Sequence, residues 1–307
     1  MKKIIGILLL FPVFSFGQQV PHISQWSQHH YAINPAHTGI KTCMEVQSTI
    51  RGQWLNIAGA PTTGFLTISA PLKAKRKKVL SARHGLGGLI STDQIGPFQQ
   101  FNFQLSYAGH FNFTVENRLS LGLAVGASQL SFDLAKAKPL TIDPVINGSN
   151  SQLLPSATFG AWWNGKNYYV GLSLYQLIKQ NWRLIGTNAQ SSMHGMINAG
   201  ARARMSESVS FLPGMYVGFT KSAPLDFQLQ ALIDYKNRFT FGLGYRNTDA
   251  VIGFFGIRFE EKWRLIYSYD FVLSSLRQGL ANTNELTLSY SPCRSINNVK
   301  QLCPLFE

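Results

Sequence analysis

The sequence has few charged residues, few cysteines and no long apolar segment beyond its first twenty positions. Charged side chains make up only 14% of the 307 residues, whereas 45% are hydrophobic. An average soluble domain is roughly a quarter charged, so this balance indicates that something other than water covers part of the surface. Three cysteines without Cys-x-x-Cys or Cys/His spacing exclude a disulfide-built scaffold and argue against a structural zinc site. The abundance of phenylalanine and leucine excludes a disordered chain.

The N-terminus has the layout of a secretory signal peptide. Lys2 and Lys3 precede an apolar stretch over residues 4–16, and Gly17 offers a small residue for cleavage. This stretch is too short for a membrane-spanning helix, which needs about 20 apolar residues, and no comparable window follows it. We therefore predict that residues 1–17 are removed. The remaining chain is expected to be periplasmic, secreted or an outer-membrane barrel.

Basic residues outnumber acidic ones by 28 to 14, which gives a net charge of +14, or +12 after signal cleavage. A dense basic run suits a solvated arm, or a site for an acidic protein face or for lipid phosphates. Nucleic acid is not an expected partner, because the chain is exported and no stacking aromatics adjoin the run. The run consists of Lys73, Lys75, Arg76, Lys77 and Lys78, within a longer basic segment that ends at Arg83.

Apolar and polar residues alternate at period two along most of the chain. In residues 117–126, leucine and valine at odd positions alternate with serine, glycine and alanine at even ones. Such alternation is typical of strands with one face in an apolar medium. Fourteen segments show it: 43–56, 61–71, 84–92, 98–111, 117–130, 153–163, 167–176, 192–204, 208–219, 225–235, 238–247, 250–259, 262–272 and 284–291.

The lengths of the connections favour a membrane barrel over a soluble all-β domain. Nearly all connections on one edge are short, such as 164–166 and 260–261, whereas long connections such as 131–152 and 273–283 lie on the opposite edge. The connection over 73–84, which carries the basic run, is a long exception on the short-turn edge. Short periplasmic turns, long outer loops and aromatic residues at strand ends are typical of outer-membrane barrels. We therefore predict an all-β fold: a closed antiparallel transmembrane β-barrel of about 14 strands over residues 43–291, located in the outer membrane.

Two segments flank the predicted barrel. Residues 18–42 are expected to form an irregular segment that packs in or under the barrel as a plug, and residues 292–307 a periplasmic tail. Asn34 and Pro35 mark a turn in the first segment. Its four histidines suggest a metal site, but their spacing does not suit convergent ligation, so a polar plug without metal or other cofactor is predicted. These histidines are His22, His29, His30 and His37.

Charged residues inside the predicted strands are expected to face the lumen, because a basic side chain facing lipid at the membrane midplane costs about 2–4 kcal/mol. Arg51, Asp270 and Glu285 come from strands that closure makes neighbours, so a network in the lumen or at the seam is expected. In the alternative interpretation, each of these three charged residues lies on a solvated rim of the barrel. Five arginines predict a basic lumen: Arg202, Arg204, Arg246, Arg258 and Arg264.

The cysteines allow two pairings in an oxidising compartment. A Cys293–Cys303 bond would close a short loop in the tail, and a competing Cys43–Cys293 bond would fasten the seam between the first and last strands. No catalytic site is predicted. The remaining histidines fall near different strand ends without a Gly-x-Ser-x-Gly motif beside them, and no phosphate-binding glycine loop is present.

Several motifs resemble, in order and spacing, the PorP/SprF family of outer-membrane proteins of the Bacteroidetes type IX secretion system. Two departures are the tail after residue 290 and His37, which stands where an aromatic residue is more usual. The matching motifs are Gln25-Trp26-Ser27-Gln28, Asn34-Pro35-Ala36-His37-Thr38-Gly39, Arg51-Gly52-Gln53-Trp54, Ala60-Pro61-Thr62-Thr63, Gly85-Leu86-Gly87-Gly88, Tyr267-Ser268-Tyr269-Asp270-Phe271 and Asn284-Glu285-Leu286-Thr287-Leu288-Ser289-Tyr290.

The resemblance implies a barrel that joins the periplasmic ring of the secretion apparatus or pairs with an exported adhesin-like cargo. On that basis Trp26, Asn34, Pro35 and the basic run are candidate partner-binding residues, with lipid as the other contact. The alternative function is a diffusion porin or a transporter of hydrophobic compounds, which would need an open lumen or a lateral gate.

Overall fold

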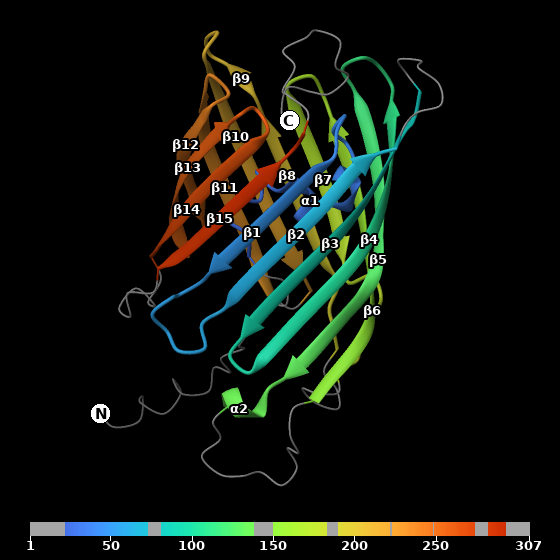
Figure 1. Ribbon diagram of the computed structural model, residues 1–307, viewed down its shortest axis with the longest axis vertical. Coiled ribbons are helices and arrows are strands. Elements are labelled where there is room, and N and C mark those ends of the chain that lie inside the picture. Colours follow the sequence, from blue (N-terminus) through green and yellow to red (C-terminus); the bar gives the residue numbers. More distant parts are fainter. Residues whose placement is uncertain are drawn as a thin grey trace, which may run out of the picture.

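The computed structural model describes residues 22–72, 81–137, 150–182, 190–221, 223–247, 249–273 and 282–292. Within these residues, fourteen antiparallel strands close into a barrel, and one further short strand, β9, lies at its edge (Figure 1). The predicted fold class is therefore confirmed. None of the helices in the described part has the length and apolar character that a membrane crossing requires.

The strands run up and down around the barrel in chain order. Closure comes from β1 and β15, which pair from Val46 opposite Tyr290 to Gly52 opposite Asn284. The strands are β1 (Glu45–Gly52), β2 (Thr62–Pro71), β3 (Arg83–Ile95), β4 (Phe98–Asn112), β5 (Arg118–Phe132), β6 (Asn150–Asn164), β7 (Tyr168–Tyr175), β8 (His194–Ala201), β9 (Ala203–Arg204), β10 (Val209–Thr220), β11 (Ala223–Tyr235), β12 (Phe239–Arg246), β13 (Ala250–Phe259), β14 (Trp263–Val272) and β15 (Thr283–Tyr290). Besides the strands, a short helix α2 (Leu134–Ala137) follows β5.

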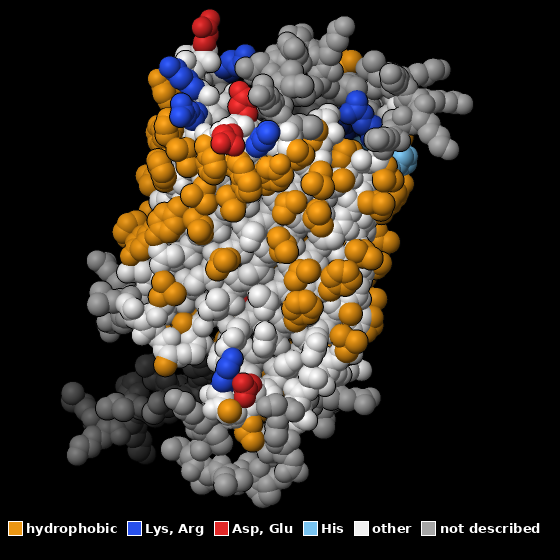
Figure 2. Space-filling model, viewed as in Figure 1, with side chains coloured by type: hydrophobic (Ala, Val, Ile, Leu, Met, Phe, Trp, Pro, Cys, Tyr) orange, Lys and Arg blue, Asp and Glu red, His pale blue; other side chains and the backbone are white. Residues whose placement is uncertain are grey.

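The period-two pattern places polar side chains inside and apolar side chains outside. On β1, Gln47, Thr49 and Arg51 are buried in the lumen, whereas Ile50 is 61% exposed on the outer wall. Figure 2 shows the result on the face in view, where hydrophobic side chains cover the barrel wall, most charged side chains lie beyond the upper end and a few lie near the lower end. Such a band is what the hydrocarbon layer of a membrane requires, because lipid cannot solvate charge.

The two ends of the barrel differ in the length of their connections. At one end, here called the turn rim, most connections are short, as at 113–117, 165–167, 236–238 and 260–262, and the β2–β3 connection over 72–82 is the long exception. Lys236 and Asn237 both have positive φ there (53° and 51°), as expected in a tight two-residue hairpin turn. The opposite end, the loop rim, has the long connections. The N-terminal end of β1 and the C-terminal end of β15 both lie at the turn rim.

Several predicted strand boundaries were wrong, and three strands illustrate the differences. The first strand ends at Gly52 instead of continuing to residue 56, because Trp54 adopts a positive φ of 53° that breaks the ladder. The eighth, predicted over 192–204, is interrupted at Arg202 into β8 and β9. The sixth, predicted over 153–163, extends to Asn150–Asn164.

Strands β4, β5 and β6 each have 15 residues and extend towards the loop rim. A transmembrane strand needs only about 9–11 residues. Because β7 has only eight residues, it pairs with β6 only over Phe159–Asn164. Below that point the Leu177 amide donates to the Ala157 carbonyl (3.1 Å), so the segment after β7 covers part of the free edge of β6.

Candidate functional site

Residues 22–42, here called the plug, cross the lumen from the loop rim to the turn rim. His22 lies 3.1 Å from the carboxylate of Asp226 near the start of β11, at the loop rim. At the other end, Arg118 donates to the carbonyl of Ile40 (3.4 Å) at the turn rim. The plug contains a single helical turn, α1 (His30–Ile33), and a 3-10 turn, η1 (Pro35–His37), and nearly all of its residues are buried. It therefore fills the lumen as a second layer inside the barrel.

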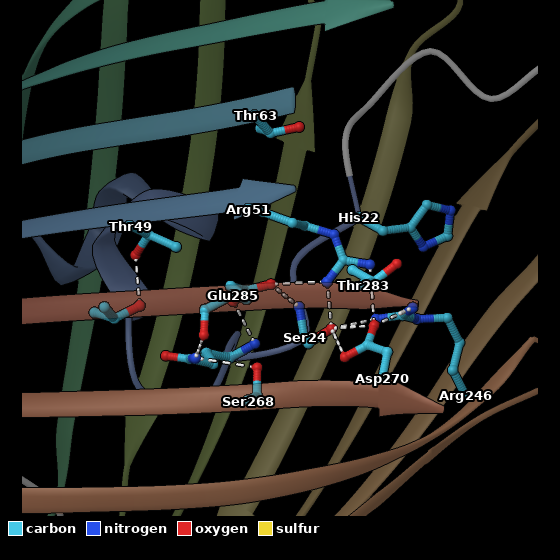
Figure 3. A network of polar contacts seen from close by, with 12 residues as sticks. His22, Ser24, Thr49, Arg51, Thr63, Arg246, Ser268, Asp270, Thr283 and Glu285 are labelled. Carbon is cyan, nitrogen blue, oxygen red and sulfur yellow. Dashed lines mark hydrogen bonds and ion pairs between the residues drawn. The ribbon is translucent and has the colours of Figure 1, made fainter. Parts of the chain in front are cut away.

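A group of four charged residues holds the loop end of the plug (Figure 3). The carboxylate of Glu285 accepts hydrogen bonds from the backbone N–H groups of Ser24 and Gln25, both at 2.8 Å. Arg51 pairs with Glu285 (2.9 Å) and Asp270 (3.0 Å), and Arg246 pairs with Asp270 (3.0 Å). We call Arg51, Arg246, Asp270 and Glu285 the clamp.

The hydroxyl of Ser24 connects both halves of the clamp. It donates to Asp270 (2.8 Å) and accepts from Arg51 (2.6 Å) and Arg246 (2.7 Å). A buried charge is strongly destabilising unless it is paired and hydrogen-bonded, and here two cations balance two anions around one hydroxyl. The clamp therefore fixes the plug by polar contacts from several strands and closes the seam from inside.

The register of the barrel explains why the clamp forms. Arg51 of β1 lies directly opposite Glu285 of β15, and Asp270 of β14 lies opposite Thr283. The structure thus brings together Arg51, Asp270 and Glu285, the three residues that the sequence suggested as a network. Sequence reasoning named Arg246 only as a lumen arginine. It missed Ser24, because Asp270 and Arg246 lie 246 and 222 positions away from this serine.

The centre of the plug is held by a neutral histidine. His29 is fully buried, and its Nδ1 and Nε2 lie 2.8 Å and 2.7 Å from the hydroxyls of Thr49 and Thr67. Burial lowers the pKa of His29 from 6.5 to about 3, so the ring is uncharged at neutral pH. Its two nitrogens therefore tie the plug to β1 and β2 without an ion pair.

At the turn end, Asn34 builds the bend that the sequence predicted. Its side-chain oxygen accepts from the Ala36 amide (2.9 Å), and its amide nitrogen donates to the carbonyls of Ala161 and Leu172, both at 3.1 Å. Gly122 makes room for this turn, since a Cβ there would lie 2.4 Å from the Ala36 nitrogen. Because Gly122 has no side chain, the plug can approach the backbone of β5 closely.

These positions bear on the suggested partner-binding residues. Trp26, Asn34 and Pro35 are buried inside the barrel, so they present no outer surface to another protein while the plug is docked. Their role in the structure is to hold the plug. The basic run Lys73, Lys75, Arg76, Lys77 and Lys78 lies outside the described residues, in the connection that joins β2 to β3 at the turn rim.

Two of the arginines predicted to face the lumen bond to an acid of the wall or to the plug. Arg202 pairs with Asp234 (2.8 Å), and Arg264 donates to the Gln28 carbonyl (2.8 Å). Arg204 is exposed on β9 and does not face the lumen.

No group of three or more potential metal ligands occurs among the described residues. The ring of His30 instead packs with its centroid 4.8 Å from that of Trp162 and 4.9 Å from that of Tyr169. Of the adjacent histidines in the plug, His29 thus bonds to hydroxyl groups and His30 packs against aromatic rings.

Cys43, just before β1, is disulfide-bonded. The other two cysteines of the chain, Cys293 and Cys303, lie outside the described residues. A bonded Cys43 is incompatible with a Cys293–Cys303 loop and agrees in kind with the competing pairing, in which Cys43 joins the C-terminal tail.

Comparison with known proteins gives both a family and a fold. The family model "Type IX secretion system membrane protein PorP/SprF" matches residues 15–290. No curated protein matches the chain. Among solved structures, a FadL homologue of Pseudomonas aeruginosa aligns with a TM-score of 0.51 at 11% identity, over 85% of this chain and 93% of that chain. A TodX mutant described as a monoaromatic hydrocarbon channel aligns with a TM-score of 0.52 at 9% identity, also over 85% of this chain and 93% of that chain. At these identities, the two structures support the barrel fold alone.

Proposed function

The chain belongs to the PorP/SprF family of type IX secretion system membrane proteins, and from this premise we propose that it is a non-enzymatic outer-membrane barrel that binds a secreted, adhesin-like cargo or the periplasmic ring. In this role it supports export of the cargo or its attachment at the surface. The observation that carries the proposal is the docked plug, because a lumen filled from rim to rim suits a protein that binds partners at its two ends.

The proposal also assigns the two rims. Outer-membrane barrels have short periplasmic turns and long outer loops, so the turn rim faces the periplasm. The basic run belongs to the β2–β3 connection of this rim, so we propose that an acidic face of a ring protein binds it on the periplasmic side.

Affinity purification from cross-linked cells tests the proposal. Recovery of a large exported adhesin supports the cargo role, and recovery of ring proteins supports the ring role. A variant with all five residues of the basic run changed to glutamine should lose ring proteins. The matched control neutralises exposed basic residues elsewhere on the turn rim, Lys236 and Arg238. Recovery of neither class of partner would contradict the proposal.

The alternative is a diffusion porin or a transporter of hydrophobic compounds. Conductance in planar lipid bilayers separates it from the proposed role. With the clamp intact, we expect the purified chain to show no steady ion current. A steady current from the unmodified protein would favour the porin.

A further inference from the structure

The plug has one polar and one apolar side, and they face different parts of the wall. Ser24 and Gln25 face the clamp on β1, β14 and β15. On the other side, Ile23, Trp26 and Ile33 line a cavity of about 80 Å³ between the plug and the wall from β2 to β10. This volume has room for several water-sized groups.

The wall opposite this apolar floor is polar but almost uncharged. Gln100, Asn102 and Gln104 project into the cavity from alternate positions of β4, and Ser156 and Thr158 do so from β6. Among the described residues that line the cavity, Asp93 alone is charged. An anionic ligand is therefore disfavoured, because its charge would lose water without gaining a counter-charge.

The spacing of the β4 amides matches an extended polypeptide. Residues two apart on a strand are separated by about 6.7 Å, which is also the repeat of any extended peptide. A peptide lying along the inner face of β4 would thus meet one amide side chain every second residue. The 15-residue β4 continues this row towards the loop rim, beyond the length that a membrane requires.

Two buried polar atoms around the cavity have no hydrogen-bond partner within the described part of the chain. They are the indole Nε1 of Trp26, a donor, and the Oε1 of Gln176, an acceptor. Leaving such buried groups unpaired is destabilising. An occupant that both accepts and donates hydrogen bonds would satisfy them.

We propose that this cavity receives one aromatic side chain of an uncharged, extended polypeptide segment that enters from the loop rim and lies along β4. The proposal rests on the proposed function, since an exported protein supplies such a segment on the outer side. Tyrosine fits best, because its ring fills the apolar floor and its hydroxyl both donates and accepts.

Binding of blocked peptides to the purified full-length protein tests the inference. The probe is an acetylated and amidated pentapeptide with a central tyrosine between threonines. The controls are the same peptide with a central aspartate and p-cresol, which is the tyrosine side chain alone. By calorimetry in detergent micelles, we expect the tyrosine peptide to bind at least tenfold more tightly than either control. Equal affinity for the three probes would overturn the proposal. Tighter binding of p-cresol would overturn it too and would indicate a site for small hydrophobic compounds.

Variants locate the site. Leu89→Trp fills the cavity from β3 and should weaken binding of the tyrosine peptide at least tenfold, and Gln104→Leu should weaken it severalfold by removing one amide. Gln228→Leu is the matched control, since Gln228 is also buried in the lumen but does not line this cavity. Thermal unfolding verifies that each variant is folded. Unchanged binding in both cavity variants would overturn the proposal.

The inference and the proposed function can fail separately. If deletion of the gene abolishes export of the cargo but no peptide binds, the function stands and the cavity is not a peptide site. If peptides bind as expected but deletion of the gene leaves export of the cargo unaffected, the peptide site is supported and the proposed role in secretion is refuted.

Discussion

Removing the charge of Glu285 should release the loop end of the plug. This side chain is 1% exposed, and its carboxylate accepts three hydrogen bonds, from the Ser24 amide (2.8 Å), the Gln25 amide (2.8 Å) and Arg51 (2.9 Å). In Glu285→Gln, one oxygen becomes an NH₂ group that cannot accept. At least one charge-assisted hydrogen bond is lost, which costs about 1.5–3 kcal/mol, and a buried donor is left unpaired at a further cost of about 1 kcal/mol.

We therefore expect docking of the plug to weaken by about 3 kcal/mol, which corresponds to roughly a 100-fold increase in the population of the released state. Amide hydrogen exchange measures this population directly, because Ser24 and Gln25 are themselves the donors. Their protection in detergent micelles should fall by about two orders of magnitude, with smaller losses nearer Ile40.

Asp234→Asn is the matched control. Asp234 is also buried in the lumen, but it pairs with Arg202 of the barrel wall (2.8 Å) and not with a residue of the plug. This variant should leave the protection of Ser24 and Gln25 unchanged. If Glu285→Gln leaves it unchanged too, the clamp does not hold the plug and the reasoning is refuted.

Three further predictions concern other parts of the plug and its attachment. His29 binds a proton below pH 6.5 when the plug is released, but only near pH 3 when the plug is docked. Docking is therefore strongest above pH 6.5 and should weaken by about 2 kcal/mol at pH 5. Exchange protection of the plug that stays constant from pH 7 to pH 5 would contradict this prediction. Gly122→Ala should weaken docking by about 1–3 kcal/mol and lower the exchange protection of residues 34–39, because the new Cβ collides with the Ala36 amide. Gly253→Ala is the control and should change this protection little, because its Cβ would meet no described atom within 4 Å. Peptide mapping without reductant should find Cys43 joined to a peptide of the C-terminal tail, and a free Cys43 thiol would rule out the bond.

The strands were predictable because the residue pattern of a membrane strand is local in the sequence. Each inward or outward position is specified by a residue and its neighbours at period two, so Leu119 to Val125 identify β5 without any distant partner. Strand ends were less accurate. Whether Trp54 continues the ladder or turns away depends on a positive φ that local preference does not specify.

Part of the site was predictable for the same reason. Closure of the barrel makes β1, β14 and β15 neighbours, so inward charges on them had to lie near one another, and Arg51, Asp270 and Glu285 do. The expectation that Trp26 and Asn34 offer a surface to a partner is not supported by their positions, because the same residue types also suit a buried contact and only the burial tells the two apart.

The sequence by itself determined that this chain is a barrel of alternating strands with a separate N-terminal segment, because low charge and period-two alternation are properties of neighbouring residues. Only the tertiary structure decided that the segment fills the lumen, that Ser24 connects both halves of the clamp and that one face of the plug borders a cavity. These features depend on contacts between residues far apart in the sequence, such as Ser24 and Asp270, which are separated by 246 positions. Register and packing bring such residues together, and no local pattern specifies them.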